Sequence, residues 1–374
     1  MIKIGITGQS GFIGTHLYNF LGLQKDKVTC IPFQDDFFSV EAKLESFVKQ
    51  CDAIVHLAAL NRHNDPQAIY NTNIELVKKL ISALENAGSK SHILFSSSTQ
   101  EERDNIFGKS KREGREMLAQ WAEKNGALFT GMVIPNVFGP FGNPYYNSVI
   151  ATFSHQLTHN EEPSVEIDAQ LKLIYVGDLV KTIYYLISNK VTDKEFKVPP
   201  TDEAKVTEIL VLLQSFKALY LEKGILPDLT DPFERNLFNT FVCYIDHSKY
   251  FPFKLKNNLD DRGSFVETVK LHSGGQVSFS TTKPGITRGN HFHTRKAERF
   301  AVIKGKALIQ LRKIGTDKVL NFHLDGKEPA FVDMPIWHTH NITNIGDEDL
   351  YTIFWTNEFF DPADPDTFFE KVGQ

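Results

Sequence analysis

Hydrophobic and polar positions follow two patterns along the 374 residues of the chain. In the first half, short apolar runs alternate with longer segments whose apolar positions recur every three to four residues, which indicates strands alternating with helices. This alternation is typical of βαβ units and a parallel sheet. The strands are expected at residues 2–7, 27–33, 53–59, 92–98 and 129–135, and the helices at 16–24, 73–88 and 110–126.

The pattern changes in the second half. Residues 200–240 look helical, and after about residue 248 short strand-like runs are separated by Gly and Pro turns. Such spacing favours an all-β sandwich or barrel. We therefore predict an α/β Rossmann-like, doubly wound parallel sheet in a domain of residues 1–248 and an all-β domain of residues 249–374.

Composition excludes several classes of protein. The net charge of −5 and the lack of a basic stripe argue against a nucleic-acid partner. The sequence contains no run of 18 apolar residues, so no membrane span is predicted. Its first residues lead directly into a strand and lack the architecture of a signal peptide. Three unevenly spaced cysteines, Cys30, Cys51 and Cys243, favour buried thiols in a reducing compartment. The expected location is the cytoplasm.

A glycine-rich motif, "TGQSGFIG" at residues 7–14, joins the first strand to the first helix. In a dinucleotide fold, Gly8 would permit the tight turn, Gly11 the approach of the pyrophosphate, and Gly14 close packing of helix on strand. The second strand ends at Gln34, with Asp35 and Asp36 slightly later. Because no acid stands at the tip to hold an NAD ribose, the sequence favours NADP.

This half resembles the extended short-chain dehydrogenase/reductase family in "GITGQSGFIG", "AIVHLAAL", "LFSSST", "FGKSK" and "IPNVFGP". The resemblance implies that Ser98 or Thr99 bonds the substrate oxygen, that Lys111 holds the nicotinamide ribose, and that Asn136 and Asn147 contact substrate. The implied cofactor contacts are Gly8, Gly11, Phe12, Ile13, Gly14, Leu57, Ala58, Ala59, Asn73, Lys111 and Pro135.

Phe107 departs from the family, because a tyrosine that donates a proton is expected four residues before Lys111. Phenylalanine has a similar volume but no hydroxyl. Three interpretations remain open. The chain is an engineered Tyr→Phe variant, or a natural relative in which water, Tyr145 or Tyr146 supplies the proton, or a non-enzyme that binds cofactor and supports the second domain.

A second motif, from Gly285 to Gly305, fits G-x5-H-x-H-x4-E-x6-G. His291 and His293 would share one face of a strand, with Glu298 on the paired strand and His340 from a later one. Three imidazoles and a carboxylate suit a divalent metal such as Zn²⁺. The alternative is a polar interior without metal.

This half resembles the cupin superfamily and so predicts a cupin barrel, although Trp337 occupies a position that is usually Gly. "DDRGSFVET" and "KPGITRGNHFH" are also similar to dTDP-sugar 3,5-epimerases. That resemblance implies that Arg262 and Glu267 bind the nucleotide sugar and that His291 acts as a base without metal. Both interpretations of His291 stay open. The acidic stretch 347–366 is expected to be a solvated edge.

As a whole, the chain resembles the CapF-type family of bifunctional capsular polysaccharide synthesis enzymes, also in "YNSVIATF" and "THNITNIGDEDLYTIFWTNEFF". The resemblance implies that the cupin half epimerises C3 of a UDP-2-acetamido-2,6-dideoxy-4-hexulose. The reductase half then reduces C4 with NADPH to a UDP-6-deoxy-N-acetyl-talosamine, a precursor of N-acetyl-L-fucosamine. It further implies a homodimer. The alternative is a scaffold that binds NADPH and nucleotide sugar with only the epimerase active.

Overall fold

The computed structural model describes residues 1–261 and 263–373, which form two compact units. The first unit comprises Met1–Thr152 and Ile167–Val206, and the second comprises Phe153–Glu166 and the chain from Thr207 onward. The helices after residue 207 therefore belong with the β-strands of the second unit. The predicted boundary at residues 248 and 249 falls within the helix α9 (His247–Tyr250), and it stays a prediction.

A six-stranded parallel sheet forms the centre of the first unit, in the order β2-β1-β3-β4-β5-β8. The five predicted strands are confirmed. The sixth was missed because its sequence, "DKEFK", is charged and mostly exposed at the edge of the sheet. The strands are β1 (Ile2–Thr7), β2 (Val28–Ile31), β3 (Ala53–His56), β4 (His92–Ser98), β5 (Phe129–Ile134) and β8 (Asp193–Lys197).

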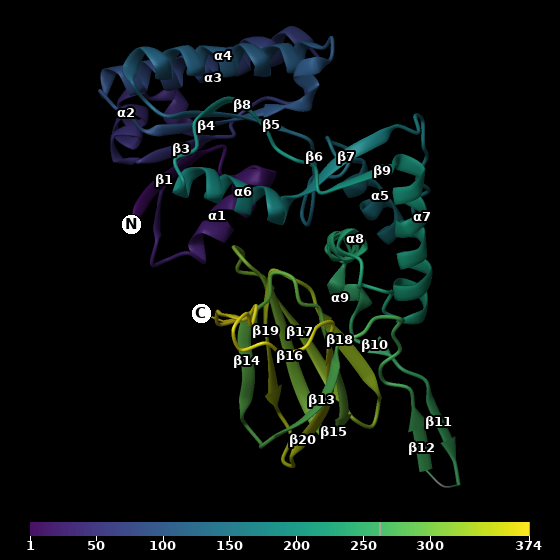
Figure 1. The fold of residues 1–374 in the computed structure, drawn as a ribbon. Coiled ribbons are helices and arrows are strands. Elements are labelled where there is room, and N and C mark those ends of the chain that lie inside the picture. Colours follow the sequence, from purple (N-terminus) through teal and green to yellow (C-terminus); the bar gives the residue numbers. More distant parts are fainter. Residues whose placement is uncertain (262, 374) are drawn as a thin grey trace. The chain divides into compact units, whose positions relative to one another are not determined.

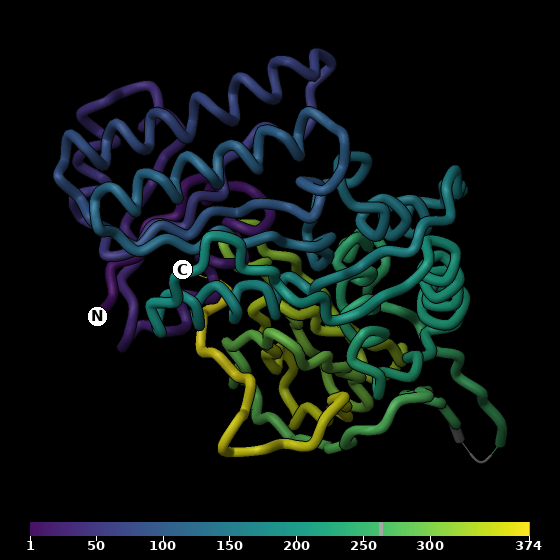
Figure 2. Tube along the Cα trace, turned by 45° about the horizontal axis from the view of Figure 1, so that its top comes forward, coloured from purple at the N-terminus to yellow at the C-terminus, as the bar shows by residue number. Residues whose placement is uncertain are grey.

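Helices cover both faces of this sheet (Figures 1 and 2). Helices α2 (Glu41–Gln50), α3 (Pro66–Asn86) and α4 (Ile106–Asn125) pack on one face, and α1 (Phe12–Gly22) and α6 (Val176–Ser188) on the other, each face with its own apolar core. A small sheet is formed by β6 (Asn136–Phe138), β7 (Gln170–Tyr175) and β9 (Asp202–Lys205). The remaining elements are η1 (Asp35–Ser39) and η2 (Thr99–Glu102).

The second unit holds two five-stranded antiparallel sheets, which confirms the all-β prediction. One sheet has the order β10-β18-β15-β20-β13, with β10 (Phe253–Lys254), β13 (Gln276–Thr282), β15 (Glu298–Lys304), β18 (Ala330–Met334) and β20 (Leu350–Thr356). The other has the order β17-β16-β19-β14-β21, with β14 (Thr287–Phe292), β16 (Lys306–Lys313), β17 (Val319–Asp325), β19 (His338–Asn344) and β21 (Phe368–Phe369).

Helices and a hairpin complete this unit (Figure 1). The hairpin pairs β11 (Asn257–Asp260) with β12 (Gly263–Val266). The helices are α5 (Val149–Thr158), α7 (Val206–Phe216), the π-helix η3 (Lys217–Leu221), α8 (Pro232–Val242) and α9 (His247–Tyr250). No helix in the described ranges combines the length and the apolar composition that a membrane span requires.

A buried ion pair fastens the helices to the strands within the second unit. The Arg299 guanidinium on β15 binds Asp333 through Nε at 2.7 Å and donates to the Gly224 carbonyl at 2.7 Å. The Tyr220 hydroxyl on η3 donates to the same carboxylate at 2.6 Å. Each nitrogen of the guanidinium has a partner, so removal of Arg299 or Asp333 alone would leave an uncompensated buried charge.

Candidate active site and metal centre

A cavity of about 990 Å³ lies within the first unit, at the carboxyl ends of its central strands. The strand order reverses between β1 and β3, and in open α/β sheets ligands bind at such a switch point. The cavity is lined by most of the residues that the sequence implicated. They are Gly8, Gly11, Phe12, Ile13, Gly14, Leu57, Ala58, Ala59, Ser98, Phe107, Lys111, Pro135, Asn136 and Asn147.

The glycine loop has the local geometry that its sequence predicts. Gly8 has a φ of +71°, and a Cβ added there would lie 2.8 Å from the Ala58 nitrogen. A Cβ on Gly14 would lie 2.2 Å from the Gly8 carbonyl oxygen, which is a backbone collision. At Gly11 the nearest atom would be 3.3 Å away. Two glycines are thus needed to form the loop, and the third leaves its backbone open toward the cavity.

Asn73 is the one predicted cofactor contact that does not line the cavity. Its side chain is 5% exposed, accepts from the Leu60 N–H at 2.7 Å and donates to the Ser110 hydroxyl at 3.0 Å. It therefore lies behind the cavity wall and ties the loop after β3 to α4.

Asp35 lines the cavity beside the glycine loop, and its carboxylate accepts a bond from the Ser10 hydroxyl at 3.3 Å. The strand β2 ends at Ile31, so the chain reaches this place through a loop that the sequence pattern did not resolve. Asp35, which the sequence places slightly after the end of the second strand, therefore brings its negative charge to the cavity wall.

Lys111 follows Phe107 by one turn of α4, and both line the cavity. The helix packs closely against η2, which follows β4, because Gly108 has no Cβ: one added there would lie 2.0 Å from the Gln100 carbonyl oxygen. The Lys111 ammonium is 4% exposed, lies 3.5 Å from the Ser96 hydroxyl and stands 4.4 Å from the centre of the Phe95 ring. Burial lowers the pKa of Lys111 to about 7, although the charge of Glu101 opposes the shift.

Arg62 is a lining residue that the sequence analysis missed. Its guanidinium donates to the carbonyls of Tyr145 and Tyr146 at 2.8 and 2.9 Å and so holds this loop at the cavity. The single signal in the sequence is a cation two residues after "HLAAL". That signal is weak, because only the fold brings residue 62 to residue 145.

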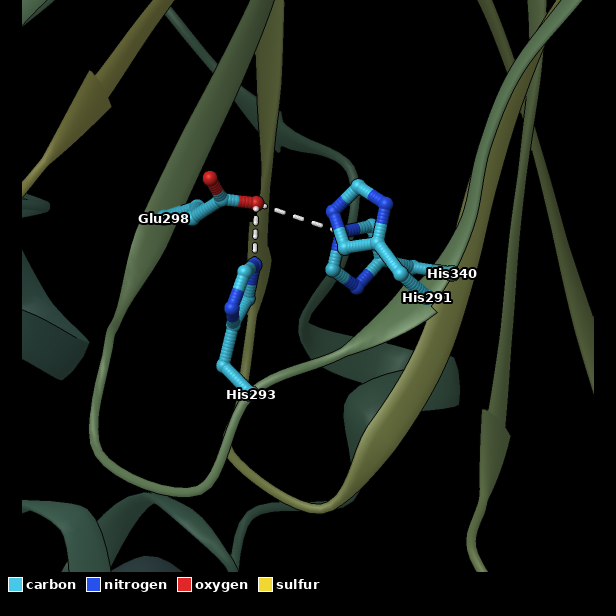
Figure 3. A group of neighbouring side chains, drawn as sticks. All are labelled: His291, His293, Glu298 and His340. Atoms are coloured by element: carbon cyan, nitrogen blue, oxygen red, sulfur yellow. Dashed lines mark ion pairs between the residues drawn. The ribbon is translucent and has the colours of Figure 1, made fainter. Parts of the chain in front are cut away.

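The four residues of the predicted metal motif converge in the second unit (Figure 3). One donor atom from each of His291, His293, Glu298 and His340 lies within 4.8 Å of the others. Zinc bound at about 2.0–2.2 Å in a tetrahedron needs donors about 3.3–3.6 Å apart. Small side-chain movements would bring the cluster to that spacing.

Glu298 arrives from the facing sheet, which corrects the expectation that it lies on a strand paired with the His291 strand. Strand β15 pairs with β18 and β20, whereas β14 pairs with β19 and β21. The loop 293–297 carries the chain from one sheet to the other. His291 and His340 are direct partners across the β14–β19 ladder. The cluster thus lies between the sheets.

Two imidazoles present bare nitrogens to the Glu298 carboxylate. His293 Nδ1 bonds the Asp366 carbonyl and His340 Nδ1 bonds the His338 carbonyl, so each Nδ1 carries the proton. Their Nε2 atoms lie 3.2 and 3.1 Å from Glu298 Oε2, and within the described residues none of the three atoms has a hydrogen-bond partner. One added proton can form a hydrogen bond in only one of the two Nε2–Oε2 contacts, whereas a metal ion can bind all three atoms. The cluster therefore fits a metal.

The electrostatics favour an ionised Glu298 and a neutral His291. Burial alone would raise the pKa of Glu298, but the His293 and His340 imidazoles hold it well below its usual range. Burial, reinforced by the two neighbouring imidazoles, lowers the pKa of His291 to about 4. Metal ligands must be deprotonated, so the shifts at Glu298 and His291 favour a cation. The Glu298 carboxylate raises the pKa of His293 against the effect of burial, so a cation would have to displace a proton from that imidazole.

Trp337, at the position where the cupin pattern usually has Gly, adopts a backbone conformation that is typical of glycine. Its φ is +59°, the left-handed region that glycine adopts without cost. Its N–H donates to the His293 carbonyl at 2.8 Å, and its ring stacks on Phe292 at 5.5 Å. The turn that leads to His340 thus has a left-handed residue at position 337 without a glycine.

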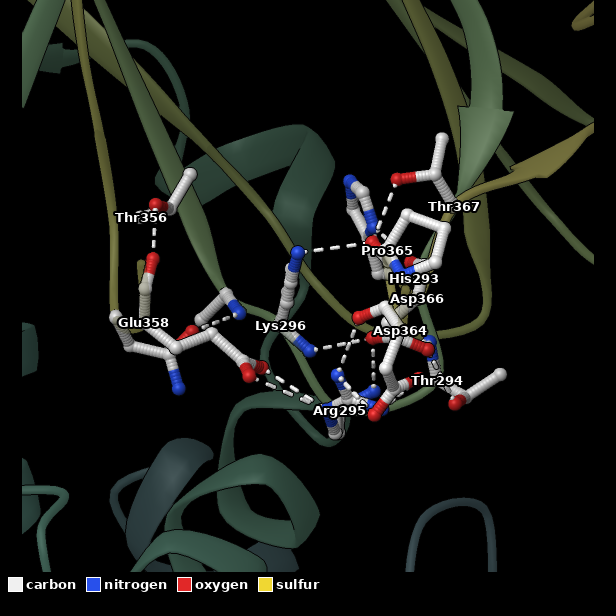
Figure 4. Close-up of polar contacts among 12 residues, drawn as sticks. His293, Thr294, Arg295, Lys296, Thr356, Glu358, Asp364, Pro365, Asp366 and Thr367 are labelled. Carbon is white, nitrogen blue, oxygen red and sulfur yellow. Dashed lines mark hydrogen bonds and ion pairs between the residues drawn. The ribbon is translucent and has the colours of Figure 1, made fainter. Parts of the chain in front are cut away.

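The acidic C-terminal stretch is a solvated edge only in part: Asp347, Glu348, Asp349, Asp361 and Asp364 are exposed, but other parts of it are buried. Residues Leu350–Thr356 form β20 inside a sheet, and Asp366 is 3% exposed. Figure 4 shows the Asp366 side chain within the loop that follows His293. Its charge is buried because backbone N–H groups surround it, which the sequence pattern could not reveal.

Of the two residues that resemblance assigned to the nucleotide sugar, Glu267 is not part of the metal cluster. Glu267 is exposed and its carboxylate binds the Lys270 ammonium at 2.7 Å. Arg262 lies outside the described residues.

Comparisons with known proteins follow the two halves of the chain. Residues 4–198 match the NAD dependent epimerase/dehydratase family, and residues 258–368 match the polysaccharide biosynthesis C-terminal domain. A UDP-2-acetamido-2,6-beta-L-arabino-hexul-4-ose reductase from Pseudomonas aeruginosa is 33% identical over 380 aligned residues, which span 100% of both chains. The chain belongs to the CapF-like family of capsular polysaccharide proteins.

Solved structures are similar over one or both halves. The capsular polysaccharide assembling protein CapF from Staphylococcus aureus is 36% identical, with a TM-score of 0.63 over 99% of this chain and 100% of that one. RMD from Pseudomonas aeruginosa, solved with NADPH, is 21% identical with a TM-score of 0.53 over 58% of this chain and 83% of that one. The CapF-like chain is thus of the oxidoreductase and epimerase type that acts on UDP-sugars.

Proposed function

We propose that the first unit reduces C4 of a UDP-2-acetamido-2,6-dideoxy-4-hexulose with NADPH. The observation that carries the proposal is the cavity at the strand switch point, lined by the glycine loop, Ser98 and Lys111. The name of the full-length Pseudomonas relative supports this substrate class, and RMD provides an example of the fold with NADPH. NADPH would supply the hydride. Ser98 would orient the substrate carbonyl, and Lys111 would hold the cofactor ribose.

The proton for C4 needs a source other than Phe107. Of the two tyrosines in the loop held by Arg62, Tyr146 lines the cavity and Tyr145 does not. We therefore assign proton donation to the Tyr146 hydroxyl. General acid catalysis contributes about 10²–10⁴-fold. Tyr146→Phe should lower NADPH oxidation by that factor, and Phe107→Tyr should restore it in the Tyr146→Phe background.

The second unit, a cupin-like double sheet in this proposal, epimerises C3 of the same sugar. The 4-keto group acidifies the proton at C3, so a base can remove it and the proton can return to the other face. His291, His293, Glu298 and His340 would hold Zn²⁺, which would supply Lewis acidity or fix the shape of the site. The alternative for His291, a base without metal, would leave epimerisation intact after chelation.

A second candidate function follows from Phe107, which lacks the expected hydroxyl. The first unit would bind NADPH and nucleotide sugar without turnover while the second unit epimerises. The test combines NADPH oxidation with uptake of solvent deuterium at C3, in wild type and Phe107→Tyr. Oxidation by wild type supports the reductase. Oxidation only by Phe107→Tyr supports the scaffold, and oxidation by neither refutes the reductase assignment.

Two further assignments complete the proposal. Exposed apolar side chains on the edge strand β13, Val277 and Phe279, and on the hairpin, Leu259 and Phe265, are suited to an interface between two copies, which supports a homodimer. Sedimentation of the purified chain tests this.

The free thiols Cys30, Cys51 and Cys243 and the use of NADPH support a cytoplasmic location.

A further inference from the structure

Asp366 is a buried carboxylate whose bonds all go to one loop, residues 294–296 (Figure 4). It accepts the N–H groups of Thr294, Arg295 and Lys296 at 3.0–3.2 Å and the Thr294 hydroxyl at 2.6 Å. Three consecutive N–H groups that converge on one anion form a fixed positive pocket. The interaction therefore locks the loop that joins the two sheets.

The same residue reaches the metal cluster through its backbone. The Asp366 carbonyl accepts the bond from His293 Nδ1, and the Lys296 ammonium holds the preceding carbonyl, that of Pro365, at 2.8 Å. Asp366 has a φ of +41°, a left-handed conformation that costs a non-glycine residue energy. The carboxylate bonds stabilise this conformation, and the conformation directs the carbonyl at His293.

The residues after Asp366 reinforce this arrangement. Strand β21 pairs with β14 directly beside the cluster, with Phe369 opposite His291. The Arg312 guanidinium binds the Val372 carbonyl at 2.8 Å and the Glu370 carboxylate at 2.8 Å. The C-terminal segment is thus held beside β14, which carries His291 and is followed directly by His293.

We propose that Asp366 is a positioning residue that aims the His293 imidazole at the metal. The inference rests on the proposed metal site. The carbonyl of Asp366 selects the tautomer of His293 with a bare Nε2, and its carboxylate keeps that carbonyl in place. Partners that orient a ligating histidine in this way commonly change metal affinity by about 10–100-fold.

The test is Zn²⁺ competition against a fluorescent chelator, in wild type, Asp366→Asn and Asp364→Asn. The amide of Asp366→Asn accepts through one atom and turns an NH₂ toward the remaining N–H groups, so zinc affinity should fall by about 10–100-fold. The Asp364 carboxylate binds the partly exposed Arg295 guanidinium and no backbone N–H of the loop 294–296 among the described contacts. Asp364→Asn is therefore the matched control, and its zinc affinity should stay within about twofold of wild type. Thr294→Ala, which removes one bond, should shift affinity in the same direction by less.

A double-mutant cycle separates positioning from general destabilisation. In a His293→Ala background, Asp366→Asn should weaken zinc binding by less than about twofold, because the histidine that it aims is gone. An equal loss in both backgrounds would overturn the inference, as would wild-type affinity in Asp366→Asn.

The imidazole nitrogen NMR spectrum of the metal-free protein makes the two proposals distinguishable. Wild type should show His293 protonated at Nδ1, and Asp366→Asn should show a mixture of tautomers. If wild type binds no zinc, the metal proposal fails, and this spectrum alone decides the role of Asp366. An unchanged spectrum in Asp366→Asn refutes that role.

Discussion

The glycine loop of the first unit and the histidine cluster of the second unit are built in opposite ways. The loop is one run of seven residues, Gly8–Gly14, whose conformation follows from backbone distances within the run and to Ala58. The cluster assembles four side chains from two facing sheets and depends on a carbonyl at residue 366. A local site can be recognised from its motif, whereas a non-local one is complete only in the folded chain.

The largest expected effect tests whether the cluster is a metal site. His340→Ala removes one of four donors, and since structural zinc sites are worth about 10–16 kcal/mol, zinc affinity should fall roughly 10³-fold. Zinc content after dialysis and chelator competition measure it. His323→Ala changes an exposed histidine and should retain zinc. Full retention in His340→Ala would exclude the cluster as the metal centre.

The buried Lys111 provides the next test, because its environment is local to α4 and β4. With a folded pKa near 7 and an unfolded pKa near 10.4, the unfolded chain binds more protons between these values, so stability rises with pH there. Lys111→Met should therefore stabilise the cofactor-free protein by several kcal/mol below pH 7, with the gain fading toward pH 10. Urea unfolding across this pH range measures it, and a gain independent of pH would contradict the assignment.

Two alanine variants divide the glycine loop into its structural and its binding part. Gly14→Ala forces a Cβ against the Gly8 carbonyl and should cost about 2 kcal/mol of unfolding free energy as well as NADPH binding. Gly11→Ala meets nothing closer than 3.3 Å and should lose NADPH binding with little loss of stability. Denaturant unfolding and NADPH fluorescence titration give both values. Equal destabilisation by the two variants would show that the loop is not divided in this way.

The smallest expected effect concerns the choice of cofactor. Asp35 places a negative charge in the cavity beside the glycine loop, which opposes the 2′-phosphate of NADPH and suits the ribose hydroxyl of NADH. Asp35→Asn should tighten NADPH binding by about 3–10-fold and weaken NADH binding. Titration with both cofactors measures the ratio, and Asp36→Asn, whose charge is already paired with Lys43 at 2.6 Å, serves as the control.

The extent of prediction differed between elements for physical reasons. The apolar strands β1–β5 were predicted because burial on both faces requires continuous apolar runs. The charged edge strand β8 carries no such signal. The first turns of α3 were also missed, although Asp65 caps the helix and Pro66 begins it. The four residues of the metal motif were found by spacing, but not the sheet from which Glu298 comes.

The sequence by itself determined the two fold types, the glycine loop and the set of four candidate ligands, because each depends on short-range periodicity or on a local backbone requirement. Only the tertiary structure decided that Asn73 lies behind the cavity wall, that Arg62 holds the loop at Tyr146, and that Asp366 is buried. These facts depend on contacts between residues 13 to 84 positions apart in the chain. A charge pattern cannot distinguish a solvated carboxylate from one that backbone N–H groups enclose, since that difference arises when the chain closes on itself.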